Sequence, residues 1–337
     1  MSDQIALDLE EAQELGLKVL RANGFNEAHA RSIMDVIYRC QLDDCHSHGL
    51  YRLLICVNTV RAGLVDGNES VEISEPSPAS IRVDAKNGYS LLAFETGLPH
   101  LIEKTKKNGV GLMAINNCFH FSALWPEVEK LSEAGLAAMA MVPSHAWVAP
   151  SGGTKGSLGT NPLAFSWPRG EKNPYTFDFA TSAIARGEIE LAKRAGHPLP
   201  EGAAIDEHGK PTIDPNEALK GAMLTFGGYK GSALSTMIEL MAGPMIGDLT
   251  SLASLEKDGN QGGTPLHGEV IIAFDPKLLG GTDTATNTRL AEALFASISE
   301  QGARLPSQRR YAARARNLEA GTVTIPKQLH EDILVLL

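Results

Sequence analysis

The chain has 337 residues, 43% of them hydrophobic and 21% charged, which is typical of a folded globular protein with room for two cooperating units. This composition excludes disorder as the main state of the chain. The 40 acidic and 30 basic residues give a formal net charge of -10, which repels nucleic acid phosphates and anionic membranes, so we expect neither as a partner.

The start of the chain and its apolar runs predict a cytoplasmic protein. Asp8, Glu10 and Glu11 precede the first apolar run, whereas a secretory signal begins with basic residues and continues into an apolar core. The best apolar stretches, 136–142 and 333–337, are far shorter than the roughly 18 to 20 residues that cross a bilayer. The four cysteines contain no C-x-x-C pair, and we expect reduced thiols.

The first part of the chain predicts three helices. Two of them fill the first forty residues, with Asp8 and Glu11 as a capping pair at the first start and Asn26 at the second. A third helix is expected over 49–62. We expect these N-terminal helices to pack against the helices at the C-terminal end.

From residue 79 onward, short strand patterns alternate with helical ones, and this texture predicts an α/β or α+β fold. By itself the alternation favours a parallel, doubly wound sheet. The expected strands are 81–83, 110–115, 136–142, 163–167, 175–179 and 270–274. The expected helices are 91–107, 124–134, 231–241, 290–298 and 311–319, with a last strand and helix after 321. Residues 198–224 are expected to form a long surface loop.

The densest group of chemically active residues stands at the entrance to the third helix. If Ser47 caps that helix, His48 lies in its first turn and Arg52 lies one turn further on the same face. A guanidinium beside a helix N-terminus suits a carboxylate, so the spacing fits an α-keto or α-imino acid. In this interpretation Arg52 holds the acid and His48 donates a proton. The alternative is a capped helix start whose histidine and arginine only meet solvent.

A metal site is the competing interpretation of the same segment. Asp43, Asp44, Cys45, His46 and His48 are all possible ligands within six positions. Neighbouring residues on a turn point in different directions, and no H-E-x-x-H or C-x-x-C motif completes a zinc shell. We expect no metal and keep a metal-dependent hydrolase as the less favoured alternative.

Three further segments are candidates for binding a nucleotide. His120 and Ser122 lie in a loop between an expected strand and helix, where backbone N–H groups suit phosphate, although a histidine between two phenylalanines is more often a packing residue. The glycine-rich stretch 227–231 opens a helix and contains one lysine. Five arginines cluster within 304–316, which suits the extra phosphate of NADP or an exposed helix face. Neither a Rossmann fingerprint in the right context nor a P-loop occurs.

Taken together, the motifs resemble the malate/L-lactate dehydrogenase superfamily of the non-Rossmann type. Within it they are similar to the branch of Δ1-piperideine-2-carboxylate/Δ1-pyrroline-2-carboxylate reductases. The stretches that carry the resemblance are His46-Ser47-His48-Gly49 with Arg52, HFSALWPEVE at 120–129, GTNPLAF at 159–165, FDFATSAIARG at 177–187, GGYKGSAL at 227–234 and RLPSQRR at 304–310.

The resemblance implies a fold that differs from the one the alternation favours. It implies an α/β (α+β) protein with a mainly antiparallel sheet flanked by helices and a helical part from both termini, and not a Rossmann fold. The helical substrate-side and dimerisation part would comprise 1–75 and 286–337, and the nicotinamide-binding domain 76–285. Members of this family are typically homodimers.

The resemblance also implies roles for individual residues. Ser47 would be a relay residue, His48 the proton donor and Arg52 the carboxylate ligand, with Thr160, Arg186 and Gly187 near the substrate. The residues implied to line the cofactor are His120, Phe121, Ser122, Ala123, Leu124, Asp178, Phe179, Ala180, Tyr229, Lys230, Arg304, Leu305, Pro306, Ser307, Gln308, Arg309 and Arg310.

The implied reaction is the NADPH-dependent reduction of Δ1-pyrroline-2-carboxylate to L-proline and of Δ1-piperideine-2-carboxylate to L-pipecolate, with NADH as a weaker donor. Such a reaction belongs to proline metabolism or to the breakdown of lysine or hydroxyproline. The alternative is a 2-keto acid dehydrogenase of the malate or lactate type. Ser307 stands where the family commonly has glycine and Tyr229 where close relatives carry histidine. Segments 144–153 and 250–263 match the pattern least, which leaves the preferred ring size open.

Overall fold

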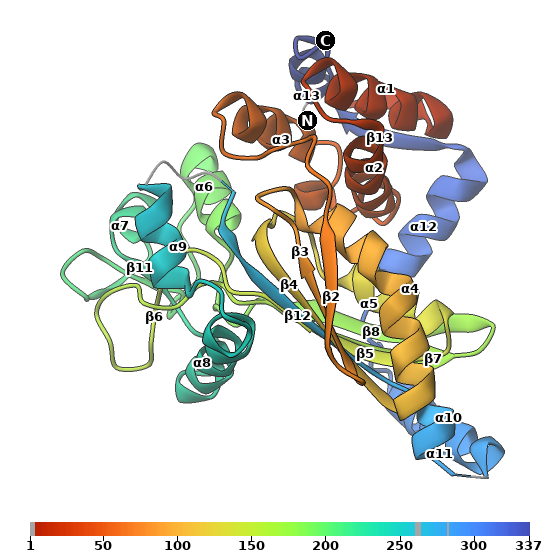
Figure 1. Ribbon diagram of the computed structural model, residues 1–337. Helices are drawn as coiled ribbons and strands as arrows, with labels where there is room; N and C mark the ends of the chain where they lie inside the picture. The colour runs from red at the N-terminus through yellow and green to blue at the C-terminus, as the bar shows by residue number, and fades with distance from the viewer. Residues whose placement is uncertain (1–3, 260–263, 282) are drawn as a thin grey trace.

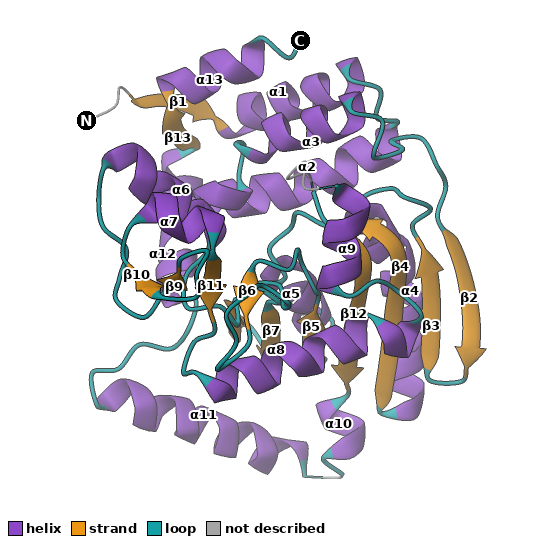
Figure 2. Ribbon diagram, turned by 90° about the vertical axis from the view of Figure 1, so that its left-hand side faces the viewer, coloured by secondary structure: helices purple, strands orange, loops and turns teal. Residues whose placement is uncertain are grey.

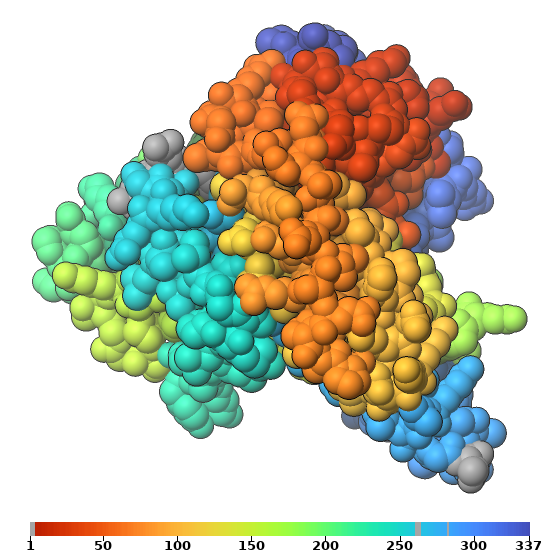
Figure 3. Space-filling model, viewed as in Figure 1, coloured from red at the N-terminus to blue at the C-terminus, as the bar shows by residue number. Residues whose placement is uncertain are grey.

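A computed structural model describes residues 4–259, 264–281 and 283–337 (Figure 1). Its centre is a seven-stranded sheet with helices on both faces. A helical part built from both ends of the chain covers one end of this sheet, at the top of Figures 1 and 3, and a smaller lobe lies at its side. Among the described residues, no helix combines the length and the apolar character needed to cross a bilayer.

The central sheet is mainly antiparallel, as the family resemblance implies. Its strands, in spatial order, are β2 (Glu72–Ser77), β3 (Ser80–Asp84), β4 (Val110–Phe119), β12 (Leu266–Phe274), β5 (Ala137–Met141), β7 (Leu163–Arg169) and β8 (Lys172–Phe179). Only β3 and β4 pair in parallel within this sheet as described. The parallel, doubly wound sheet expected from the alternation alone is therefore wrong. The reason is that β12, from late in the chain, inserts between β4 and β5 and runs antiparallel to both.

Period-two alternation along the central strands explains how both faces are covered. Met113 and Ile115 of β4 pack with α4 (Ser90–Asn108) and α5 (Trp125–Glu133), whereas Ala114 between them packs with α8 (Tyr229–Ala242). In β12, Ile271 and Val270 divide between the same two faces. Figure 1 shows α8 on the opposite side of the sheet from α4. The stretches 110–115 of β4 and 270–274 of β12 are therefore apolar on both faces, as expected for a sheet covered on both sides.

The two ends of the chain pack together, which confirms that expectation. The elements are α1 (Leu9–Ala22), α2 (Glu27–Leu42) and α3 (Arg52–Arg61) from the N-terminal end, and α12 (Gln308–Ala320) and α13 (Lys327–Leu334) from the C-terminal end. Strand β1 (Gln4–Asp8), which the sequence did not reveal, pairs antiparallel with β13 (Thr322–Pro326). Asn26 caps α2 by accepting the backbone N–H of His29 at 3.0 Å, whereas Asp8 precedes α1 without a side-chain cap.

The smaller lobe contains most of the segment expected to be a surface loop. Within and beside 198–224, strands β9 (Ala204–Ile205), β10 (Pro211–Thr212) and β11 (Ala222–Leu224) join β6 (Val148–Ala149) in a second sheet. Helices α6 (Arg186–Ala195), α7 (Pro215–Lys220) and α9 (Ser251–Asp258) complete the lobe. Part of the poorly matching segment 250–263, residues 260–263, lies outside the described residues.

Two helices project from the other end of the sheet, α10 (Pro276–Leu279) and α11 (Thr284–Glu300). Figure 2 shows α11 as a long helix at the lower edge of the molecule. Its one buried residue is Phe295, which stacks on Tyr175 at 5.1 Å between ring centroids. The domain boundaries expected at 75 and 286 fall inside β2 and α11, and the division into two domains stays a prediction.

Candidate active site

The structure brings Ser47, His48 and Arg52 together, but not in the way the spacing suggested. Residues His46–His48 form a short 3-10 helix, and α3 begins only at Arg52, so the prediction that Ser47 caps the third helix is wrong. The interruption lies at Gly49, where a Cβ atom would come within 2.3 Å of the Gln41 side chain. A turn from the Gly49 carbonyl to the Arg52 N–H, at 2.9 Å, then returns the guanidinium to the imidazole.

Hydrogen bonds within this turn decide which nitrogen of His48 carries the proton. An Nη2 group of Arg52 lies 3.3 Å from His48 Nε2, and Arg52 Nε donates to the Ser47 carbonyl at 2.7 Å. A guanidinium has only donors, so Nε2 must accept. The ring proton is then on Nδ1, 3.0 Å from the hydroxyl of Ser47.

The charge states of His48 and Arg52 favour the binding of an anion. Burial, and secondly the charge of Arg52, lower the pKa of His48 to about 3. Burial also lowers the pKa of Arg52. Within the described part of the chain, no carboxylate pairs with this guanidinium. A partly buried arginine without an acidic partner, beside an uncharged imidazole, favours the binding of a carboxylate.

His120 lies where the end of β4 meets the start of β12, near His48 and Arg52. It directly follows β4, and its backbone N–H donates to the Pro265 carbonyl at 3.1 Å. Burial lowers the pKa of His120 well below its usual value, and His267, His48 and Arg52 lower it further. The rings of His120 and His267 lie 5.8 Å apart. The structure thus brings His120 near His48 and Arg52, and its role in binding the cofactor stays a prediction.

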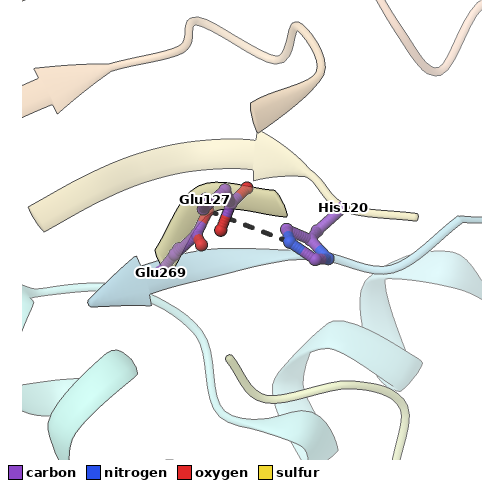
Figure 4. A group of neighbouring side chains, drawn as sticks. All are labelled: His120, Glu127 and Glu269. Atoms are coloured by element: carbon purple, nitrogen blue, oxygen red, sulfur yellow. Dashed lines mark ion pairs between the residues drawn. The ribbon is translucent and has the colours of Figure 1, made fainter. Parts of the chain in front are cut away.

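Two buried glutamates stand behind His120, and the sequence did not reveal them (Figure 4). Glu127 lies on α5 and Glu269 on β12, and they are 1% and 0% exposed. One side-chain atom from each of these residues and one from His120 lie within 4.8 Å of one another, a group that could hold a metal ion or a proton. The one available signal was the run HFSALWPEVE, whose acids read as the ordinary exposed acids of a helix start.

Arg186, which the resemblance implies to lie near the substrate, is connected to the neighbourhood of His267 through Trp147 and His145. The guanidinium of Arg186 lies 4.0 Å from the ring centroid of Trp147, and that ring makes an edge contact of 4.9 Å with His145. His145 in turn lies close enough to His267 to lower its pKa. His145 and Trp147 thus connect Arg186 to the neighbourhood of His267, which sequence reasoning did not predict. Gly187, next to Arg186, is exposed.

Thr160 belongs to a loop that is hydrogen-bonded to the buried carboxylate of Glu239. Its carbonyl accepts the backbone N–H of Thr181 at 2.8 Å. The neighbouring Asn161 donates to Glu239 Oε1 at 2.7 Å, and the N–H of Gly159 donates to the same oxygen at 3.2 Å. Glu239 on α8 therefore fixes the loop, so that Thr160 is positioned by rigid elements.

Asp178 joins two of the segments expected to line the cofactor. Its Oδ2 atom accepts the backbone N–H groups of Leu124 and Trp125 at 2.8 and 3.0 Å, although burial raises its pKa to about 6. Phe121, Ser122 and Ala123 donate no backbone hydrogen bond to any described residue. Ser122 itself donates its hydroxyl to the Ala123 carbonyl at 2.6 Å. Three unused N–H groups at the start of α5 fit the phosphate of a nucleotide.

The glycine-rich segment meets the end of β8 from the other side. Gly227 and Gly228 have positive φ angles of 57° and 60°, and Tyr229 and Lys230 follow them, exposed, at the start of α8. Phe179 next to Ala180 makes an edge contact with Phe226 at 5.8 Å. The two segments expected to contact the cofactor are thus neighbours in space.

The segment 304–310 divides into internal and exposed residues. Arg310 pairs with Asp43 and Glu129 and lies 3.7 Å above the ring of Trp125, so its guanidinium already has acidic partners. Arg304 and Arg309 are exposed and form no ion pair with a described residue. The residues of this segment that line a cavity of about 400 Å³ beside the β7–β8 hairpin are Leu305, Pro306 and Gln308.

The segment 43–48, considered above as a possible metal site, has both of its carboxylates paired with arginines. Asp43 accepts hydrogen bonds from Arg310 and Arg314, and Asp44 pairs with Arg316. Both acids therefore neutralise arginines of α12, which gives no support to a hydrolase built on this segment.

Comparison with known proteins identifies the family of this chain. The family model described as malate/L-lactate dehydrogenase matches residues 7–334. The chain is 57% identical to a Δ1-pyrroline-2-carboxylate reductase of Pseudomonas fluorescens over 100% of both chains. It is 53% identical to a Δ1-pyrroline-2-carboxylate/Δ1-piperideine-2-carboxylate reductase of Pseudomonas aeruginosa over 99% of both.

A solved structure gives the same result for the fold. The Δ1-piperideine-2-carboxylate reductase of Pseudomonas syringae superimposes with a TM-score of 0.92 at 35% sequence identity, covering 99% of this chain and 100% of that one. The mainly antiparallel architecture is thus that of the non-Rossmann dehydrogenases. The chain belongs to the malate/L-lactate dehydrogenase family and is an oxidoreductase, which implies a nicotinamide cofactor.

Proposed function

We propose that the protein reduces cyclic imino acids with NADPH, forming L-proline from Δ1-pyrroline-2-carboxylate and L-pipecolate from Δ1-piperideine-2-carboxylate. The observation that carries the proposal is the Arg52 guanidinium, which is partly buried, lies beside His48 and has no acidic partner among the described residues. The names of the reductases most similar to this chain support the same substrates.

In this proposal, Arg52 binds the substrate carboxylate through two parallel hydrogen bonds. The bound acid offsets the charge of Arg52, which is the second cause of the low pKa of His48, and so raises the affinity of the imidazole for a proton. His48 then protonates the imine nitrogen while C2 accepts a hydride. The product is the secondary amine. Ser47 holds the ring of His48 through Nδ1.

The residues present fit a dinucleotide. The unused N–H groups of 121–123 suit a phosphate, and the exposed Arg304 and Arg309 suit the additional phosphate of NADPH. Tyr229 and Lys230 stand beside the 178–180 segment. When bound, the reduced nicotinamide supplies the hydride. Within this proposal the dimeric state and the cytoplasmic location follow the family resemblance, and the exposed Leu290 and Leu294 of α11 offer an apolar contact surface.

A side-by-side kinetic assay tests the proposed reaction. The two cyclic imines, pyruvate and oxaloacetate are each supplied with NADPH and with NADH. We expect the highest kcat/KM with a cyclic imine and NADPH, and an activity unchanged by a metal chelator. A higher kcat/KM with pyruvate or oxaloacetate would establish the 2-keto acid dehydrogenase instead.

A further inference from the structure

The buried acids behind His120 have no partner that explains them. Within the described structure, all four carboxylate oxygens of Glu127 and Glu269, and the Nε2 atom of His120, are enclosed without a hydrogen-bond partner. The shortest contact between the histidine and the acids joins His120 Nε2 to Glu269 Oε2 at 3.8 Å (Figure 4). Three buried polar groups that face one another without other partners require something shared between them.

The carboxylates of Glu127 and Glu269 cannot both stay negatively charged, because they are buried side by side. Burial raises the pKa of both acids; Glu269 and Asp178 raise the pKa of Glu127 further, whereas the contact with Glu127 lowers the pKa of Glu269. One added proton or one bound cation would remove the repulsion. A divalent ion usually needs more ligands than these three side chains, and the glutamates, at 1% and 0% exposed, leave little access for the waters that would complete its shell. The burial therefore favours the proton.

We propose that Glu127 and Glu269 are a positioning pair that shares one proton and retains one negative charge, and that this charge fixes the Nε2–H tautomer of His120. Glu127 carries the proton and donates it toward Glu269. Glu269 then attracts the Nε2–H of His120, and a small rotation of either side chain closes the 3.8 Å separation to a hydrogen bond.

A fixed Nε2–H tautomer determines what the other ring nitrogen of His120, Nδ1, can bind. With the proton on Nε2, Nδ1 is a hydrogen-bond acceptor on the part of the ring away from the acids. His48 and Arg52 lie near enough to His120 to lower its pKa, so this acceptor is close to the proposed reaction centre. An acceptor there suits an amide N–H group such as that of the nicotinamide carboxamide. Only this last step rests on the proposed function.

His267 provides an internal reference for the test. Its Nδ1 atom lies 2.9 Å from the Gly268 carbonyl, which can only accept, so the ring proton of His267 is on Nδ1. The two neighbouring histidines should therefore be opposite tautomers. Nitrogen NMR of protein labelled with ¹⁵N-histidine, without nucleotide, distinguishes them, and His120→Asn assigns the signal of His120.

Two matched variants separate the roles of the acids. In Glu127→Gln, the amide N–H replaces the donating O–H, so we expect the His120 tautomer unchanged. In Glu269→Gln, the negative charge beside His120 is lost, so we expect mixed tautomers for His120, an unchanged His267 and a fall in kcat/KM of roughly tenfold or more. Infrared spectroscopy should detect a protonated carboxylic acid near neutral pH in wild type and its loss in Glu127→Gln.

Four results would overturn the inference. They are a proton on Nδ1 of His120 in wild type, no protonated acid in the infrared spectrum, an unaltered tautomer in Glu269→Gln, or a stoichiometric divalent metal that disappears in Glu127→Gln. If Glu269→Gln does not fold, the wild-type tautomer and the infrared comparison with Glu127→Gln still decide. Because these measurements use the nucleotide-free protein, they are independent of whether the substrate is an imine.

Discussion

The carboxylate of Asp43 and the guanidinium of Arg314 form a two-pronged ion pair, with Nε and Nη2 each 2.7 Å from an oxygen of the acid. The pair connects the end of α2 to α12, so it links the N-terminal and C-terminal ends of the chain directly behind the 45–52 segment. The Asp43 side chain is 0% exposed and also accepts from Arg310. This contact therefore supports the turn that carries His48.

Replacing Asp43 with asparagine should destabilise the protein by about 3 kcal/mol, because it removes a buried charge and leaves two partly buried arginines, Arg310 and Arg314, to share Glu129. Asp44→Asn is the matched control, since Asp44 pairs with Arg316 and its side chain is 40% exposed. That change should cost about 1 kcal/mol or less. Urea unfolding of both variants measures the difference, and equal losses would contradict the assigned importance of Asp43.

Replacing His48 with alanine should lower kcat by about 10² to 10⁴, the usual contribution of a general acid. His46→Gln is the control, because His46 lies in the same 3-10 helix but contacts Gln41 and not Arg52. Steady-state rates with Δ1-pyrroline-2-carboxylate and NADPH test this. Wild-type turnover in His48→Ala would refute the proton-donor role.

Replacing Arg52 with alanine should act mainly on substrate binding. The loss of a charged hydrogen-bond partner for the carboxylate predicts a weakening of about 2 kcal/mol, which is roughly a 30-fold rise in KM. Arg61→Ala at the far end of α3 is the control, since its side chain bonds to Asn23. A KM unchanged in Arg52→Ala would show that the acid group binds elsewhere.

The low pKa of His48 also predicts a pH dependence of stability. The folded-state pKa is about 3, against about 6.5 in an unfolded chain, so between these values only the unfolded chain binds the proton. The free energy of unfolding should therefore decrease as the pH falls through this window. His48→Gln should reduce the slope by up to about 1.4 kcal/mol per pH unit. Chemical unfolding between pH 4 and 7 measures it, with His330→Gln on α13 as the control, and a slope equal to that of wild type would be the contrary result.

Ser307 adopts a left-handed conformation, with φ at 64°, which glycine adopts without strain, and this fits the glycine that the family resemblance implies at this position. Its hydroxyl donates to the Thr176 carbonyl at 2.8 Å and accepts from Arg310 at 2.8 Å. Ser307→Ala keeps the strain and loses both bonds, so we expect a loss of about 1 to 2 kcal/mol. Ser307→Gly also relieves the strain and should be closer to neutral. Thermal unfolding that ranks glycine below alanine would contradict this account.

Local pattern alone was sufficient for much of this protein. Most helices and central strands follow from apolar spacing, because that spacing records which side of an element is buried. The neighbourhood of His48 and Arg52 was also predictable, since residues four apart meet across a single turn whether or not Ser47 caps a helix. The motifs also carried the family resemblance that the comparisons confirm.

Tertiary structure decided what depends on residues far apart in the chain. The insertion of β12 between β4 and β5 made the sheet antiparallel, and no local pattern specifies which distant strand will pair. The same insertion places Glu269 beside Glu127 and His120. An acid in a helix start or at one strand position reads as an ordinary polar residue, because only the packed neighbours determine whether water or another carboxylate surrounds it.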